Sequence, residues 1–129
     1  LGVGFVFYPA DAQAMVDAGA DVIIATCGPT QGGSAGYPPM NAAIAIEKIG
    51  AIAQAAKAKN PQVFVLGHGG PFNTPESTRL LYDQTRVDGY FGGSSIERIP
   101  VEQAVYDIVR QYKAPVLSQL KSKTERVMQ

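Results

Sequence analysis

The chain has 129 residues, of which 46% are hydrophobic and 17% charged, and its 11 acidic side chains balance 11 basic ones. This composition predicts one folded domain with a real core and argues against disorder. A zero net charge without a basic run argues against nucleic acid as a direct partner, and no apolar run approaches the roughly 18 residues needed to cross a bilayer.

Short apolar segments and helical patterns alternate along the chain. Strands are predicted at residues 3–7, 21–26, 62–66 and 88–91, because each is almost continuously apolar, as in parallel strands covered on both faces. The first helical pattern runs from Pro9 to about Ala18 and stops at Gly19, which suits the position after a helix. The second covers residues 42–56, the third begins with Thr74 as N-cap and Pro75, and the fourth covers residues 101–112.

Four strand-helix units in this order predict a parallel sheet with right-handed crossovers. Their spacing is that of a (β/α)8 TIM barrel, so the expected α/β fold is half a barrel over residues 1–113. Residues 114–129 are expected to form a tail or short helix without a chemical role. The alternative is an open flavodoxin-like sheet, but such a sheet usually needs a fifth strand, and the chain offers none after Lys113.

The loops that follow the strands are the expected place for chemistry, because the carboxyl ends of parallel strands meet at one edge. The segment after the second strand, residues 26–40, is about twice the usual length. Glycine pairs in the three later loops allow close approach of backbone amides to an anion, although tight turns also need glycine. The candidate ligand-binding residues are Gly32, Gly33, Ser34, Gly69, Gly70, Gly92, Gly93, Ser94, Ser95 and Arg98. A Walker loop and a dinucleotide fingerprint are both missing.

His68, the only histidine, follows a buried strand and is the first candidate for acid-base catalysis, since its ordinary pKa near ~6.5 suits proton transfer at neutral pH. It could equally anchor the glycine turn beside it. Glu97 is a second catalytic candidate, with Arg98 as an anion-binding neighbour, or the two form a surface pair at a helix start. Cys27 is the single cysteine and is more simply a buried side chain than a nucleophile. We assign no metal ligands, and Mg²⁺ held by loop carboxylates is the one cofactor left open.

The blocks Gly32-Gly33-Ser34, residues 67–71 (GHGGP) and residues 92–102 (GGSSIERIPVE) resemble the phosphoenolpyruvate hydrolase-like TIM-barrel family, whose members are also called TIM-barrel signal-transduction proteins. The same domain is similar to the C-terminal part of a plant inhibitor of tobamovirus RNA replication. The resemblance covers almost all of residues 3–113 and implies the C-terminal half of an eight-unit barrel, usually oligomeric. Where bacterial members carry a histidine at the end of the second strand, this chain has Thr26-Cys27.

Three functions remain open at this point. The chain either acts on a small phosphorylated or carboxylated acid such as phosphoenolpyruvate, or binds such an anion as a non-catalytic signalling module, or serves as an interaction module like the viral inhibitor. We expect a cytoplasmic protein without a membrane partner, because the residues from Leu1 onward lack the basic region and cleavage-site pattern of a signal peptide. We also expect either a homo-oligomer or a partner segment that supplies the missing N-terminal half of the barrel.

Overall fold

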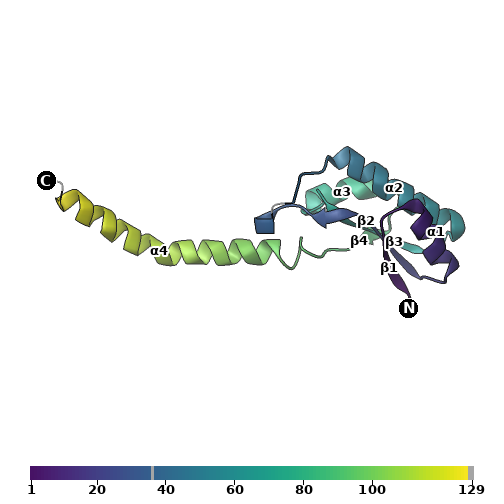
Figure 1. Ribbon diagram of the computed structural model, residues 1–129, viewed down its shortest axis with the longest axis horizontal. Helices are drawn as coiled ribbons and strands as arrows, with labels where there is room; N and C mark the ends of the chain where they lie inside the picture. The colour runs from purple at the N-terminus through teal and green to yellow at the C-terminus, as the bar shows by residue number, and fades with distance from the viewer. Residues whose placement is uncertain (36, 128–129) are drawn as a thin grey trace.

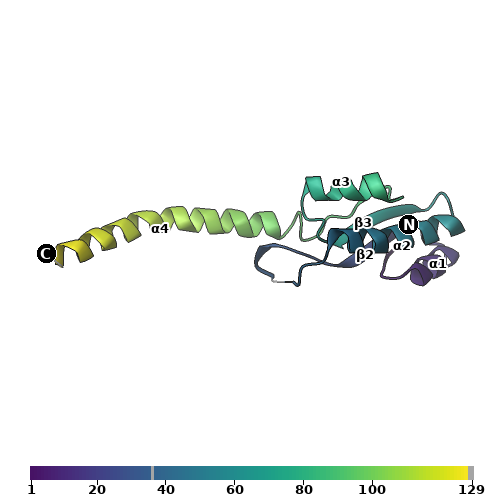
Figure 2. The same cartoon turned by 90° about the horizontal axis from the view of Figure 1, so that it is seen from above.

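A computed structural model describes residues 1–35 and 37–127 of the chain, with side chains at residues 1–35, 37–117, 119 and 120 (Figures 1 and 2). In chain order the elements are β1 (Val3–Val6), α1 (Pro9–Asp17), β2 (Val22–Thr30), the 3-10 helix η1 (Gly33–Ala35), α2 (Ala42–Lys59), β3 (Phe64–Gly70), α3 (Pro75–Gln84), β4 (Gly89–Tyr90) and α4 (Ile99–Val127).

The four strands form one parallel sheet in the order β1-β2-β3-β4. Consecutive neighbours of this kind are what a (β/α)8 barrel places side by side, whereas a flavodoxin-like sheet reverses its strand order near the middle. The fold is therefore α/β, and it is half of a TIM barrel, as the sequence predicted.

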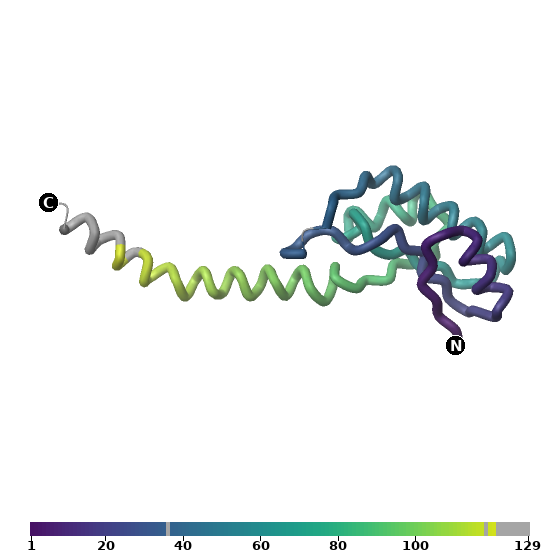
Figure 3. The backbone as a smooth tube through the Cα atoms, in the orientation of Figure 1, coloured from purple at the N-terminus to yellow at the C-terminus, as the bar shows by residue number. Residues whose placement is uncertain are grey.

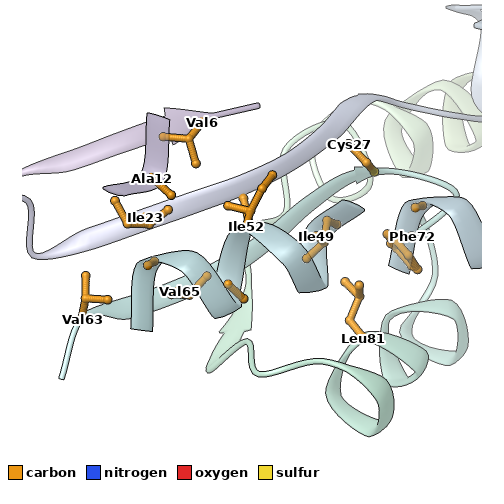
Figure 4. Close-up of a cluster of buried hydrophobic side chains, with 14 residues drawn as sticks. Val6, Ala12, Ile23, Cys27, Ile49, Ile52, Val63, Val65, Phe72 and Leu81 are labelled. Atoms are coloured by element: carbon orange, nitrogen blue, oxygen red, sulfur yellow. The ribbon is translucent and has the colours of Figure 1, made fainter. Parts of the chain in front are cut away.

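The core lies between the sheet and the helices α1, α2 and α3 (Figure 4). Side chains alternate along each strand, so Ile23 and Val65 point toward the helices. There they join the same buried cluster as Ile49 and Ile52 of α2. Gly67 faces the same way, because a Cβ there would lie 2.8 Å from Leu81 Cδ1 of α3. His68, the next residue, therefore projects from the opposite face of the sheet.

That opposite face is apolar and largely open to solvent. Phe5 is 51% exposed and Phe64 is 55% exposed, with Val3 and Phe91 also exposed on this side. In a closed barrel this face becomes the interior, where side chains from all eight strands pack in layers. The exposed aromatic rings therefore mark the surface that the other half of a barrel would cover.

Two local signals in the sequence are confirmed. Gly19 has a φ of 90° directly after α1, in the left-handed region that glycine tolerates. The Thr74 side chain accepts a hydrogen bond from the Ser77 backbone N–H, which completes a capping box, and Pro75 opens α3.

The predicted ends of the second and third strands are wrong. β2 continues to Thr30 and β3 to Gly70, so Thr26, His68 and Gly69 lie within strands and not in loops. The pairing continues through a register irregularity between Thr26 and Thr30, because two glycines let the backbones approach closely. A Cβ on Gly69 would lie 1.9 Å from the Gly28 carbonyl oxygen, so this approach requires glycine.

α4 leaves the sheet and runs away from the other helices (Figures 1 and 3). It passes residue 113, where the sequence placed the end of the half-barrel, and continues to Val127. Residues 128 and 129 of the expected tail lie outside the described residues. No helix in the described part of the chain, α4 included, is both long enough and apolar enough to cross a membrane.

Candidate functional site

His68 stands on β3 at the carboxyl end of the open sheet face. Its Nδ1 lies 2.8 Å from the Phe91 carbonyl oxygen, which can only accept a hydrogen bond, so Nδ1 carries a proton. No hydrogen bond reaches Nε2 from the residues that the structure describes. In the neutral ring Nε2 is therefore a free proton acceptor.

Two aromatic rings hold the His68 ring in place. Phe5 from β1 and Phe91 after β4 contact it edge-on, with ring centroids 5.3 and 5.6 Å away, and the two phenylalanine rings contact each other at 5.3 Å. Such edge-to-face contacts fix ring orientation. The imidazole on β3 is thus positioned by a residue of β1 and by the residue that follows β4.

The loop after β4 lies directly beside this ring. A Cβ on Gly93 would lie 3.5 Å from His68 Cε1, an ordinary contact, and the φ of Gly93 is outside the left-handed region. The structure therefore brings Gly93 and His68 together without demanding a glycine at position 93. Gly92 differs, because a Cβ there would collide with the Ile96 side chain.

The remaining candidates after β4 have different surroundings. Ser95 Oγ lies 3.3 Å from the Tyr90 hydroxyl, which also hydrogen-bonds the Phe72 carbonyl oxygen. Burial raises the pKa of Tyr90, so this hydroxyl stays protonated. The Ser94 carbonyl accepts from the Arg98 and Ile99 backbone N–H groups at the approach to α4. The Glu97 side chain is exposed, and the structure brings no described hydrogen-bond partner to it.

Gly69 and Gly70 are buried where β2 and β3 approach each other. A Cβ on Gly70 would lie 2.5 Å from the Cys27 sulfur, and both glycines have positive φ. Packing therefore explains why these two positions are glycine. Cys27 is itself buried, and desolvation raises the pKa of its thiol, which disfavours the thiolate needed for nucleophilic attack.

A second group of candidates gathers at η1. The Arg98 guanidinium donates to the Gly32 carbonyl oxygen at 3.1 Å and contacts the Glu102 carboxylate at 3.1 Å. The same carboxylate accepts from the Ser34 backbone N–H at 2.8 Å and from the Ser34 hydroxyl at 2.7 Å. The hydrogen bonds from the Ser34 N–H and hydroxyl are the main reason that the pKa of Glu102 lies below its ordinary value; desolvation opposes them, and Arg98 adds a smaller lowering effect.

Glu102 was not among the candidates predicted from the sequence. Its spacing of four residues from Arg98 is a signal for a helical ion pair. The two contacts with Ser34 span 68 residues of chain and follow only from the fold. Among the described residues, no group of three or more histidine, cysteine, aspartate or glutamate side chains is placed to hold a metal ion.

Most of the chain is similar in sequence to known proteins. It is 43% identical over 119 residues to the "ToMV susceptible protein tm-1(GCR26)" of Solanum lycopersicum and 42% identical over 119 residues to the "ToMV resistance protein Tm-1(GCR237)" of the same plant, with 88% of this chain and 15% of each relative covered. It is also 29% identical over 106 residues to the "Putative transcriptional regulatory protein y4pA" of Sinorhizobium fredii (strain NBRC 101917 / NGR234), covering 81% of this chain and 17% of that protein.

The chain thus spans less than a fifth of the length of these relatives. The family model described as "Phosphoenolpyruvate hydrolase-like" matches residues 1–114, from before β1 to the middle of α4. The chain therefore belongs to the phosphoenolpyruvate hydrolase-like family.

Proposed function

We propose that this half-barrel binds and acts on a small phosphorylated or carboxylated acid, of which phosphoenolpyruvate is the first candidate, at the carboxyl end of its sheet. The observation that carries the proposal is the hydrogen bond from His68 Nδ1 to the Phe91 carbonyl. It leaves Nε2 as the acceptor, beside Gly93 and on the face that a closed barrel would enclose. In hydrolysis of phosphoenolpyruvate, Nε2 takes a proton from the water that attacks phosphorus, the bond between phosphorus and the enol oxygen breaks, and the enolate that leaves takes up a proton to become pyruvate.

The ligand's anionic group is met by the loops around this ring. Gly92, Gly93, Ser94 and Ser95 supply backbone N–H groups and hydroxyls near His68, and Gly32, Gly33, Ser34 and Arg98 supply a second set of donors at η1. Backbone N–H groups and a guanidinium are the donors that phosphates and carboxylates prefer. Gly69 and Gly70 contribute indirectly, because they let β2 and β3 approach each other closely beside the site.

Glu97 and a Mg²⁺ ion are also part of the proposal, although no described residue contacts the Glu97 carboxylate through a hydrogen bond. The exposed Glu97 side chain stands free to supply a carboxylate from the loop after β4. Mg²⁺ prefers carboxylate oxygens and usually bridges to the ligand's phosphate. If the ion is used, Glu97 would be one of its carboxylate ligands, and the ion would supply positive charge to the ligand's anionic group.

A second candidate is a non-catalytic interaction or signalling module. The observation in its favour is the similarity to proteins named for susceptibility and resistance to ToMV. In addition, Thr26-Cys27 stands in β2 at the place where the resemblance to bacterial members implies a histidine. Such a module keeps the anion pocket, has no turnover, and assembles either with a second copy or with the rest of a barrel. A cytoplasmic setting suits both candidates.

Calorimetric titration of phosphoenolpyruvate and of inorganic phosphate into the complete barrel protein tests the proposal. We expect His68→Asn to keep the fold and to weaken phosphoenolpyruvate binding or turnover at least about tenfold, equal to ~1.4 kcal/mol. Phe64→Leu, on the same face of β3 but at its other end, is the matched control and leaves affinity unchanged.

Three outcomes separate the alternatives. No binding at millimolar ligand, or undiminished binding by Gly93→Val, rejects the site. A His68→Asn variant that loses melting temperature but no affinity makes His68 a structural residue. Binding without release of phosphate or pyruvate from phosphoenolpyruvate favours the non-catalytic module.

A further inference from the structure

The Glu102 carboxylate accepts four hydrogen bonds from three donor groups of this chain. The Ser34 backbone N–H and hydroxyl reach its two oxygens at 2.8 and 2.7 Å, and Arg98 Nη1 reaches them at 3.1 and 3.3 Å. Two consecutive glycines with positive φ, Gly32 at 93° and Gly33 at 68°, shape the turn that presents Ser34. Consecutive N–H groups in such a turn form a concave anion-binding surface.

The donors are held in place independently of Glu102. The second guanidinium nitrogen of Arg98, Nη2, donates to the Gly32 carbonyl at 3.1 Å and lies 3.5 Å from the Thr30 carbonyl. Thr30 in turn pairs with Gly70 of β3. The arginine is therefore anchored to the sheet through β2, and its Nη1 edge remains directed at the anion after the Glu102 side chain leaves.

The space around the carboxylate is tight toward Gly33 and open elsewhere. A Cβ on Gly33 would lie 2.3 Å from Glu102 Oε2 and 2.6 Å from Arg98 Nη1, so glycine is required for the contact. Beside it lies an open cavity of about 410 Å³, lined by Gly33, Ser34, Ile99, Glu102, Gln103 and Tyr106. A volume of this order accommodates a small organic acid. Solvent reaches the pair, with 25% of the Arg98 side chain and 30% of the Glu102 side chain exposed.

We propose that Ser34, Arg98 and the Gly32-Gly33 turn form an anion-binding site that Glu102 occupies from within the chain, and that a phosphate or carboxylate ligand binds there by displacing Glu102. This rests on the proposed function and deepens it, since it assigns the ligand's anionic group to the donors at η1 and makes Glu102 an internal competitor. The Ser34 N–H, Ser34 hydroxyl and Arg98 Nη1 are the ligand's partners.

The displacement also couples the ligand to α4. Glu102 lies in the first turn of α4, and its contacts with Ser34 join that turn to the loop after β2. A ligand that binds Ser34 and Arg98 breaks these contacts between α4 and the loop after β2. By linkage, a change that removes the Glu102 carboxylate must raise the ligand's affinity.

The test compares inorganic phosphate binding by wild type, Glu102→Gln and Asp107→Asn, measured by calorimetry on the complete barrel protein. Asp107 lies on the same helix, and the described chain gives its carboxylate only a contact with Gln103. Both variants remove one negative charge, so a general electrostatic effect appears in both. We expect phosphate affinity to rise at least about tenfold in Glu102→Gln relative to Asp107→Asn.

Two further variants guard against a Glu102→Gln protein whose amide still occupies the site or whose helix is disturbed. Glu102→Ala removes all side-chain acceptors and is expected to show the same gain, with far-UV circular dichroism confirming that α4 is intact. Adding Arg98→Met or Ser34→Ala to Glu102→Ala must abolish or weaken the gain. Equal phosphate affinities in Glu102→Gln, Glu102→Ala and Asp107→Asn, or a gain that survives Arg98→Met, overturn the proposal.

The test separates this inference from the proposed function. Sensitivity of phosphoenolpyruvate binding to His68→Asn without any effect of Glu102 variants rejects the internal competitor and keeps the His68 site. A gain in phosphate affinity through Glu102→Ala without any effect of His68→Asn keeps the η1 site and rejects the role of His68.

Discussion

Two glycines near the site are present for different physical reasons. Gly69 has a φ of 81°, and any side chain at this position meets the Gly28 carbonyl oxygen. Gly93 has an ordinary backbone conformation and room for a methyl group next to His68. The fold therefore requires glycine at position 69 but not at position 93.

Gly69→Ala is expected to destabilise the fold by more than about 2 kcal/mol, since it adds both left-handed strain and a steric clash. Gly93→Ala, the matched control, should stay within about 0.5 kcal/mol of wild type. Thermal denaturation followed by circular dichroism measures both. Similar melting temperatures for the two variants would contradict the packing role of Gly69.

At the residue scale the sequence predicted where several candidate side chains lie, but not the charged contacts that they make. The place of His68 at the carboxyl end of the sheet could be predicted from the apolar run before it and the glycine pair after it, although the residue lies within β3 and not after it. The role of Glu102 could not, since its partner Ser34 lies 68 residues away and no local pattern links the two. Arg98 is predicted to bind a ligand, and in the structure its guanidinium contacts the carboxylate of Glu102 in the first turn of α4.

At the scale of elements, an ion pair joins α2 to the sheet. Lys57 Nζ lies 2.7 Å from Asp88 Oδ2 and also donates to the Val63 carbonyl, while the Val65 N–H donates to Asp88. Burial alone would raise the pKa of Asp88, but the hydrogen bonds from Lys57 and Val65 and the charge of Lys57 outweigh it and lower the pKa. The carboxylate is thus favoured in the folded state.

Asp88→Asn is expected to lower stability by about 1 to 2 kcal/mol at neutral pH, because it weakens hydrogen bonds to charged groups. Since the folded pKa of Asp88 is below its ordinary value of 3.8, its contribution is complete above pH 3.8 and is lost as the pH falls through the folded pKa. The difference in melting temperature between wild type and variant should therefore shrink in acid.

Asp17→Asn is the matched control, since it removes the exposed pair between Asp17 of α1 and Lys59 of α2. Exposed ion pairs contribute little, so this change should be nearly neutral. A constant difference between wild type and Asp88→Asn from pH 7 down to pH 2 would refute the role of the Asp88 carboxylate.

The elements themselves were predictable to different degrees. Long helices such as α2 have an apolar stripe that defines them, and the cap of α3 is visible in Thr74 and Pro75. The extensions of β2 and β3 were not predictable, because they depend on glycines that let two backbones meet across the sheet. The path of α4 away from the sheet could not be predicted from local sequence patterns either. Apolar spacing predicts which face of a helix packs against another surface, but not which surface that is.

At the scale of the whole molecule, the described part of the chain leaves two apolar surfaces uncovered. One is the open sheet face with Phe5 and Phe64, and the other is the stripe of α4 that includes Val101 and Val105, both more than half exposed. Exposed apolar surfaces of this extent mark interaction sites. β1 and β4 are also edge strands that bear no lysine or proline to discourage pairing.

We expect the isolated 129-residue chain to self-associate, with two copies covering each other's open sheet face as two halves of one barrel do. Light scattering on the purified chain measures this. Phe64→Lys should shift the population toward monomer, whereas Ile44→Lys, which changes an exposed side chain on the outer surface of α2, should not. A well-folded monomer of wild type with one sharp thermal transition would count against the half-barrel as an incomplete unit.

The brevity of β4 has a consequence for how a barrel closes. Only two residue pairs join β4 to β3, whereas four join β1 to β2. A neighbouring strand that docks beyond β4 finds a ladder too short to guide its alignment through main-chain hydrogen bonds. The register of a strand that pairs on that side must therefore be set by side-chain packing, and the ring of Phe91 is the nearest side chain that can set it. A sequence that completes this barrel is thus constrained most strongly at the residues that contact that ring.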